Sequence, residues 1–126
     1  MDEINEAIKK FQKELNGGTA SLVLLAVLNK ASHPMYGYQI AKLIENQTKD
    51  VDIMKQGALY PVLRSLEATG LLKSEVEPSV SGPPRRYYRI TPLGRDALEA
   101  WRSTWAATRD FVDATLNRAA AQETSS

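Results

Sequence analysis

The chain has 126 residues, of which 43% are hydrophobic, enough for one compact domain with an ordinary core. It contains no cysteine, which excludes disulfides, thiolate metal sites and thiol nucleophiles. The formal net charge is +1, yet between residues 55 and 95 seven basic residues face only three acidic ones, which predicts a local basic surface. The longest apolar run, residues 22–28, is too short to cross a bilayer, and no leader-like segment opens the chain, so we expect a soluble, cytoplasmic protein.

The chain begins with a predicted amphipathic helix over residues 1–16. Apolar residues recur at spacings of four and three, at Ile4, Ile8, Phe11 and Leu15. We expect this helix to stop at Gly17-Gly18, because glycine weakens a helix. A narrow apolar stripe of this kind needs a partner surface, so we predict that this helix contributes to a dimer contact.

A second helix is predicted over residues 20–30, with Thr19 as its cap. Its sequence is apolar almost all round, which places it at the centre of the core. A buried strand is the alternative, but the leucine and alanine content favours a helix. His33-Pro34 then breaks the chain, and a third helix is expected over residues 36–48, followed by a polar connector over 49–55.

The fourth predicted helix covers residues 57–69 and ends at Gly70. Pro61 lies in its first turn, where a proline is tolerated. The inward face has the helical spacing of three and four, and consists of Leu59, Val62, Leu63 and Leu66. The same rotation turns Tyr60 and Arg64 outward, with Gln56 at the leading end.

Two strands follow, over residues 71–76 and 85–90, joined by a segment rich in proline, glycine and serine. They predict a hairpin whose tip is too long for a tight turn. Thr91-Pro92 is a strong helix start, since the hydroxyl caps and the proline is pre-set for the first helical position. We expect this last helix to run over residues 92–118, leaving 119–126 as a disordered tail.

This order of elements predicts a mainly α fold with a small β-hairpin (α+β), namely a winged helix-turn-helix over residues 19–91 with an added helix at each end. Such a domain inserts its last short helix into the DNA major groove, which is about 12 Å wide. Gln56 and Arg64 can read adenine and guanine edges, and Tyr60 can reach a phosphate. We expect Arg85 and Arg86, held at a stiff tip behind Gly82, to clamp phosphates.

Simpler explanations exist for each of these residues. An outward arginine such as Arg64 is usually just solvated, and the pair Arg85-Arg86 could be a strand-edge charge pair that prevents sheet aggregation. Lys73, Arg89 and Arg95 are weaker candidates for phosphate contact.

The last helix carries a heptad-like seam that is longer than one small domain needs for its own core. Its leading members are Leu98, Trp101, Trp105 and Val112. We predict that this seam packs on a second copy of the chain. Twofold symmetry would then present two recognition helices to two half-sites of one duplex.

Several linked motifs resemble the PadR family of transcription regulators over about residues 19–105. They are YGYQI at residues 36–40, GALYPVLRSLE at 57–67, GLL at 70–72 and GPPRRYYRITPLGR at 82–95. The resemblance implies a homodimeric winged-helix repressor that binds double-stranded DNA. It places Tyr38, Tyr60, Arg64, Arg85 and Arg86 at the DNA. Many members carry threonine where this chain has Ala58, which puts one phosphate contact in doubt.

For small members, the resemblance also implies a planar aromatic, drug-like effector held between tryptophans at the dimer centre. Trp101 matches that position, with Trp105 one turn further on. The alternative is that both rings are plain interface anchors.

Two other classes of function are alternatives to a DNA-binding regulator. A winged-helix module that binds an acidic protein partner, and not DNA, is compatible with the near-neutral charge. An enzyme is disfavoured, because there is no glycine-rich phosphate loop, nucleophile elbow or pocket-like carboxylate pair, and His33 is the single histidine. We therefore predict no catalytic residue, metal or cofactor.

Overall fold

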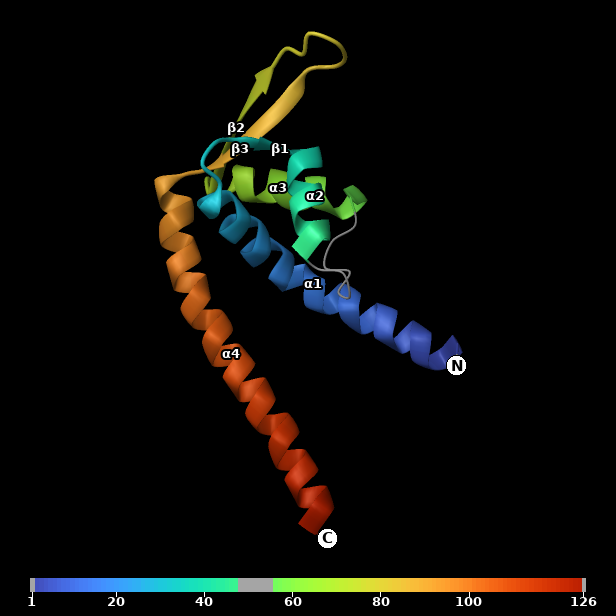
Figure 1. Cartoon of the computed structure of the whole chain (residues 1–126). Coiled ribbons are helices and arrows are strands. Elements are labelled where there is room, and N and C mark those ends of the chain that lie inside the picture. Colours follow the sequence, from blue (N-terminus) through green and yellow to red (C-terminus); the bar gives the residue numbers. More distant parts are fainter. Residues whose placement is uncertain (1, 48–55, 126) are drawn as a thin grey trace.

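A computed structural model describes residues 2–47 and 56–125 of the chain (Figure 1). Its helices and strands follow the predicted winged-helix order, and β1, β3 and β2 form, in that spatial order, one small antiparallel sheet. The elements are α1 Asp2–Lys30, β1 Met35–Tyr36, α2 Gly37–Gln47, α3 Gln56–Ala68, β2 Leu72–Glu77, β3 Arg85–Ile90 and α4 Pro92–Ser125. The predicted connector over residues 49–55 lies outside the described residues.

The first two predicted helices are a single helix, α1, so the predicted break at Gly17-Gly18 is wrong. Thr19 does not cap a helix; its hydroxyl donates to the Leu15 carbonyl one turn earlier, at 3.0 Å. A glycine costs a helix about 1 kcal/mol relative to alanine, which does not interrupt a helix whose following turns are anchored in the core. The helical interpretation of residues 20–30 is confirmed, with Leu24 and Leu25 completely buried.

The chain after the His33-Pro34 break first forms a short strand, so the predicted helical state of Tyr36 is wrong. Met35 and Tyr36 pair with Tyr88 and Tyr87 of β3, and α2 begins only at Gly37. The Gln39 side chain accepts a hydrogen bond from the Tyr36 backbone N–H at 3.1 Å, half of a capping box. This bond fixes the start of α2 against the sheet edge.

Helix α3 has the predicted inward face and the predicted end. Leu59, Leu63 and Leu66 are buried. Gly70 has a positive φ of 82°, and the N–H groups of Leu71 and Gly70 donate to the carbonyls of Leu66 and Glu67. These two bonds form a Schellman motif, which turns the chain directly into β2.

The hairpin has two chemically different faces, because side chains alternate along a strand. Leu72, Tyr88 and Ile90 point to the core side and are buried. Lys73 and Arg89 are paired in register and lie on the opposite, outer side. The predicted strand boundaries are correct to within one residue, with β2 shifted to Leu72–Glu77.

Helix α4 starts as predicted at the Thr91-Pro92 cap. The Gly94 N–H donates to the Thr91 hydroxyl oxygen at 3.0 Å, and that hydroxyl donates to the Gly70 carbonyl at 2.7 Å. The helix continues to Ser125, beyond the predicted end at 118, so the segment predicted as a disordered tail is largely helical.

The core lies between α1, α2, α3 and the hairpin, and its five largest fully buried side chains are Leu24, Leu25, Ile40, Leu59 and Leu63. From this core α1 and α4 diverge, so that the two ends of the chain extend as separate arms (Figure 1). Both arms expose large apolar side chains, including Phe11 on α1 and Phe111 on α4 at 62% and 70% exposure.

Candidate nucleic-acid interface

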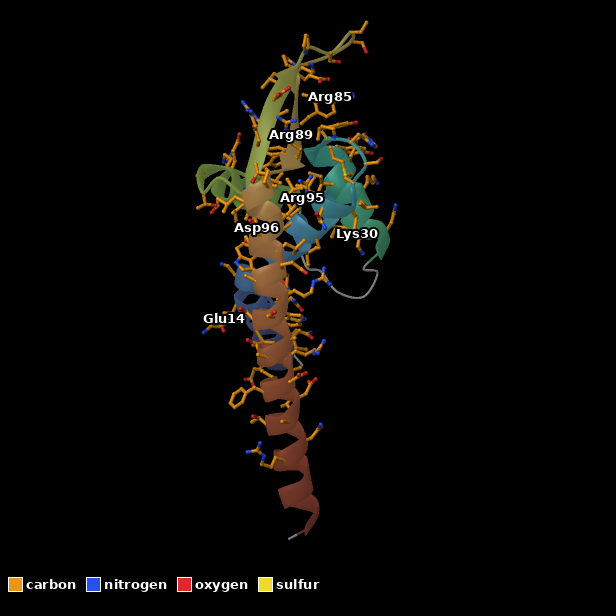
Figure 2. The ribbon with its side chains drawn as sticks, turned by 90° about the vertical axis from the view of Figure 1, so that its left-hand side faces the viewer. Glu14, Lys30, Arg85, Arg89, Arg95 and Asp96 are labelled. Atoms are coloured by element: carbon orange, nitrogen blue, oxygen red, sulfur yellow. The ribbon has the colours of Figure 1, made fainter. Side chains whose placement is uncertain are left out.

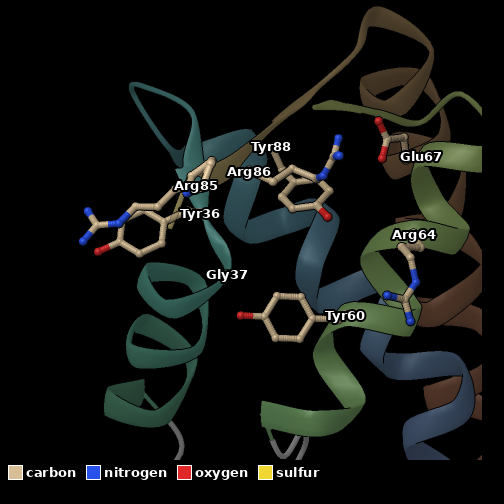
Figure 3. Close-up of a pocket in the computed structure, with 9 residues that line it drawn as sticks. Tyr36, Gly37, Tyr60, Arg64, Glu67, Arg85, Arg86 and Tyr88 are labelled. Atoms are coloured by element: carbon tan, nitrogen blue, oxygen red, sulfur yellow. The ribbon is translucent and has the colours of Figure 1, made fainter. Parts of the chain in front are cut away.

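A groove of about 570 Å³ separates α3 from the base of the wing, and we call it the α3–wing groove (Figure 3). It is lined by Tyr36, Gly37, Tyr60, Arg64, Glu67, Pro84, Arg85, Arg86 and Tyr88. Four of the predicted DNA-contacting residues are in this set: Tyr60 and Arg64 from α3, and Arg85 and Arg86 from β3. The groove contains three arginines and one carboxylate among its described lining, which suits a polyanion.

Tyr60 and Arg64 project from the exposed side of α3, as their spacing from Leu59 and Leu63 predicts. Tyr60 also depends on Gly37 of α2. A Cβ atom added at Gly37 would lie 2.6 Å from the Tyr60 hydroxyl oxygen, so a larger residue would displace this ring. The first residue of α2 therefore allows Tyr60 to lie across the gap between α2 and α3 (Figure 3).

Arg85 stacks on an aromatic cluster at the edge of the groove. Its guanidinium carbon lies 4.6 Å from the centre of the Tyr36 ring. Tyr36 in turn meets Tyr87 edge-on at 5.4 Å and stacks with Tyr38 at 6.4 Å between ring centres. Arg85 is the first residue of β3 and not part of a free tip, and the ring orients its charge. Tyr38 is 51% exposed beside this cluster but does not line the groove.

Arg86 is held by a relay that the sequence reading missed. Its Nη1 donates to the Ser74 hydroxyl oxygen at 2.9 Å, and that hydroxyl donates to Glu67 Oε2 at 2.5 Å. The relay joins α3, β2 and β3 and so ties the wing to α3. In the sequence, Glu67 follows Arg64 by three residues, which places both on one side of the helix. This spacing indicates that the Glu67 carboxylate faces the wing, but it does not identify Ser74 or Arg86 as its partners.

Tyr88 lies beneath Arg86 at the back of the groove (Figure 3). Burial raises the pKa of the Tyr88 hydroxyl, and the nearby Glu67 carboxylate raises it further. The phenol is therefore neutral at physiological pH, so it adds no negative charge to the groove.

A second hollow, of about 360 Å³, lies between α1 and α4 and contains both tryptophans of the predicted effector site. Its lining comprises Glu14, Leu15, Gly18, Thr19, Leu22, Trp101, Thr104, Trp105 and Thr108. Leu98 is different, because it is only 5% exposed and belongs to the core of its own chain. The assignment of Leu98 to a dimer seam is therefore withdrawn. The prediction for the Gln56 side chain lies outside what the structure describes.

A three-stranded sheet with a long hairpin, packed behind the exposed helix α3, defines a protein of the winged helix-turn-helix class. The chain belongs to the transcriptional regulator PadR-like family, whose family model matches residues 24–100. No helix within residues 2–47 and 56–125 is both long and apolar enough to cross a membrane.

Individual relatives agree with this assignment. A crystal structure of a PadR family transcriptional regulator from Eggerthella lenta is similar over 92% of this chain and 97% of that one, with 30% identity and a TM-score of 0.77. A transcriptional regulator from Clostridium thermocellum is similar over 79% and 95% of the two chains, with 28% identity and a TM-score of 0.71. Transcriptional regulator Rv3488 of Mycobacterium tuberculosis is 60% identical over 42 residues, 33% of this chain and 38% of that protein. The chain is thus a transcriptional regulator with the PadR-like winged-helix fold.

Proposed function

We propose that the chain is a homodimeric, sequence-specific repressor that binds duplex DNA through the α3–wing groove. The observation that carries this proposal is the position of Tyr60 and Arg64, exposed on one rigid helix, in the same groove as Arg85 and Arg86 of the wing. An α-helix with its side chains is narrow enough to fit the DNA major groove, while the hairpin follows the DNA backbone.

The residues proposed to contact DNA divide into two roles. Arg64 and Gln56 read base edges, because their side chains have the paired donors and acceptors that guanine and adenine match. Tyr38, Tyr60, Arg85 and Arg86 bind phosphates and set the register of the protein on the duplex. Arg85 suits this role because stacking on Tyr36 uses the face of its guanidinium, whereas phosphate contacts use the N–H groups at its edge.

Substitution of Arg64 and of Arg85 separates the two roles. Fluorescence anisotropy would compare the duplex upstream of the protein's own gene with a scrambled duplex. Arg64→Ala should cost about 1–3 kcal/mol on the specific duplex and little on the scrambled one, thereby reducing sequence preference. Arg85→Ala should weaken both duplexes alike and lower the slope of log K against log salt by about 1.

Arg102→Ala is the matched control, since it removes one exposed cation from α4 outside the groove and should leave binding unchanged. Normal duplex binding by both groove variants would show that the reading face is assigned wrongly. If the unsubstituted protein bound neither duplex, the alternative of a protein-interaction module would take its place.

The proposed dimer rests on the apolar arms. Trp105, Val112 and Leu116 are exposed on α4, while Ile4 and Ile8 are exposed on α1. A single chain leaves these side chains in water, whereas a second copy would cover them. Of the predicted seam, Trp101, Trp105 and Val112 are retained in this proposal.

The proposal includes a small-molecule effector that binds in the hollow between α1 and α4 and releases the repressor from DNA. The Trp101 and Trp105 side chains line it, and a planar aromatic ligand would stack on such rings. Titration with a planar cationic dye should quench tryptophan fluorescence, and Trp105→Ala should raise the dissociation constant of the dye at least about fivefold, since one stacking contact is worth about 1 kcal/mol. No quenching at high micromolar dye would leave the tryptophans as interface anchors only.

A further inference from the structure

A second basic hollow lies on the outer face of the wing, and we call it the reverse-face pocket. It is about 550 Å³ in volume, within the range of roughly 300–1,000 Å³ typical of small-molecule sites. The end of α1 and the following loop form one wall, the outer face of the hairpin forms another, and the start of α4 closes it. The lining includes none of Tyr38, Tyr60, Arg64, Arg85 and Arg86, but it does include the three weaker candidates for phosphate contact, Lys73, Arg89 and Arg95.

The described lining of this pocket carries three cations, Lys73, Arg89 and Arg95, and no carboxylate. Figure 2 shows Arg89 and Arg95 one above the other on this side of the molecule, with Asp96 labelled next to Arg95. Arg89 also meets Glu75, but that ion pair is long, at 3.8 Å, and both side chains are more than half exposed. Such a surface pair is weak and leaves Arg89 free to turn toward a stronger anion.

Two further polar groups complete the site. The Ser32 hydroxyl and the His33 ring, 3.1 Å apart, lie on the wall opposite the hairpin. Arginines bind phosphate oxygens in pairs, a lysine adds a point charge, and a hydroxyl donates one further bond. This combination matches a compact ligand with several negatively charged oxygens.

We propose that the reverse-face pocket binds a small phosphate-bearing molecule with at least two negative charges. A duplex in the α3–wing groove meets Arg86 and Tyr88 on one side of the hairpin, and Arg85 at the tip end of β3. Lys73 and Arg89 are paired in register on the opposite side, so that duplex does not occupy them. The inference does not depend on the proposed DNA binding.

Isothermal titration of the full chain with pyrophosphate, at constant ionic strength, tests the site. We expect saturable binding, with amide NMR shifts concentrated at Ser32, Ile90 and Arg95. The double substitution Lys73→Ala/Arg95→Ala should raise the dissociation constant by at least about tenfold, as expected for the loss of two charged contacts. Arg89→Ala is the second variant, for use if the double variant is not folded by circular dichroism.

Lys10→Ala/Lys13→Ala is the matched control, since it removes the same charge from exposed positions of α1. It should leave the pyrophosphate affinity within about twofold of the original, because exposed charges more than a Debye length away are screened. Equal weakening by both double variants would mean general attraction and would overturn the proposal. Failure of pyrophosphate to bind would also overturn it, and weaker duplex binding by Lys73→Ala/Arg95→Ala would then show that these cations serve the DNA backbone.

Discussion

Val112→Glu is expected to convert the protein into a monomer at micromolar concentration and to lower its affinity for the upstream duplex by at least about 100-fold. Val112 is 46% exposed on α4, and Trp105 lies on the same side of the helix two turns earlier. A buried, unpaired carboxylate in a dimer seam is strongly unfavourable. Loss of the dimer removes the linked second half-site, whose contribution to avidity is of the order of 10²–10⁴.

Ala114→Glu is the control for this experiment. It lies two residues further along, close to the opposite side of α4, and is also exposed. It should leave both the sedimentation coefficient and the duplex affinity unchanged. A Val112→Glu protein that remained dimeric with normal DNA affinity would show that this side of α4 is not the interface.

Gly94→Ala is expected to lower the free energy of unfolding by about 3 kcal/mol, at the upper end of typical overpacking costs. A Cβ atom at this position would overlap the Leu71 carbonyl oxygen and lie 2.7 Å from Ile90 Cγ1. The carbonyl belongs to the backbone at the Schellman turn, so it cannot move aside as a flexible side chain would. For a domain of this size we expect the thermal midpoint to fall by about 10 °C.

Gly17→Ala provides the opposite result and is the matched control. Gly17 is also helical, but a Cβ atom added there meets nothing within 4 Å. The substitution should raise the free energy of unfolding by about 0.5–1 kcal/mol, since alanine loses less backbone entropy in a helix. Thermal denaturation of the two variants measures both effects, and a stability loss at Gly17 as large as that at Gly94 would refute the steric explanation.

Local sequence signals predicted most of the fold. The apolar spacing of Leu59, Leu63 and Leu66 set the buried face of α3, and therefore the exposure of Tyr60 and Arg64. Gly70 and Thr91 marked helix boundaries. A positive φ favours glycine and a helix cap requires a side-chain hydroxyl, so a single residue type identifies each boundary. These features depend on neighbours within one or two turns, which is why the sequence alone is sufficient.

The errors have a different origin. Gly17-Gly18 is a strong local stop signal, yet α1 continues because its later turns are held in a core made by distant segments. Met35 and Tyr36 became a strand because β3, some fifty residues later, offers an edge to pair with. In both cases tertiary contacts outweighed a local preference worth only about 1 kcal/mol per residue.

The sequence by itself determined which residues could bind a polyanion, since charge and helical spacing can be read from the chain. Only the tertiary structure decided how they are grouped. Folding of the hairpin against α3 joined Glu67, Ser74 and Arg86 in one relay and stacked Arg85 on Tyr36. It also placed Lys73 and Arg89 on the other side of the wing, because the pleat separates adjacent side chains onto opposite faces. Such groupings arise from the angle between elements far apart in the chain, which no local pattern encodes.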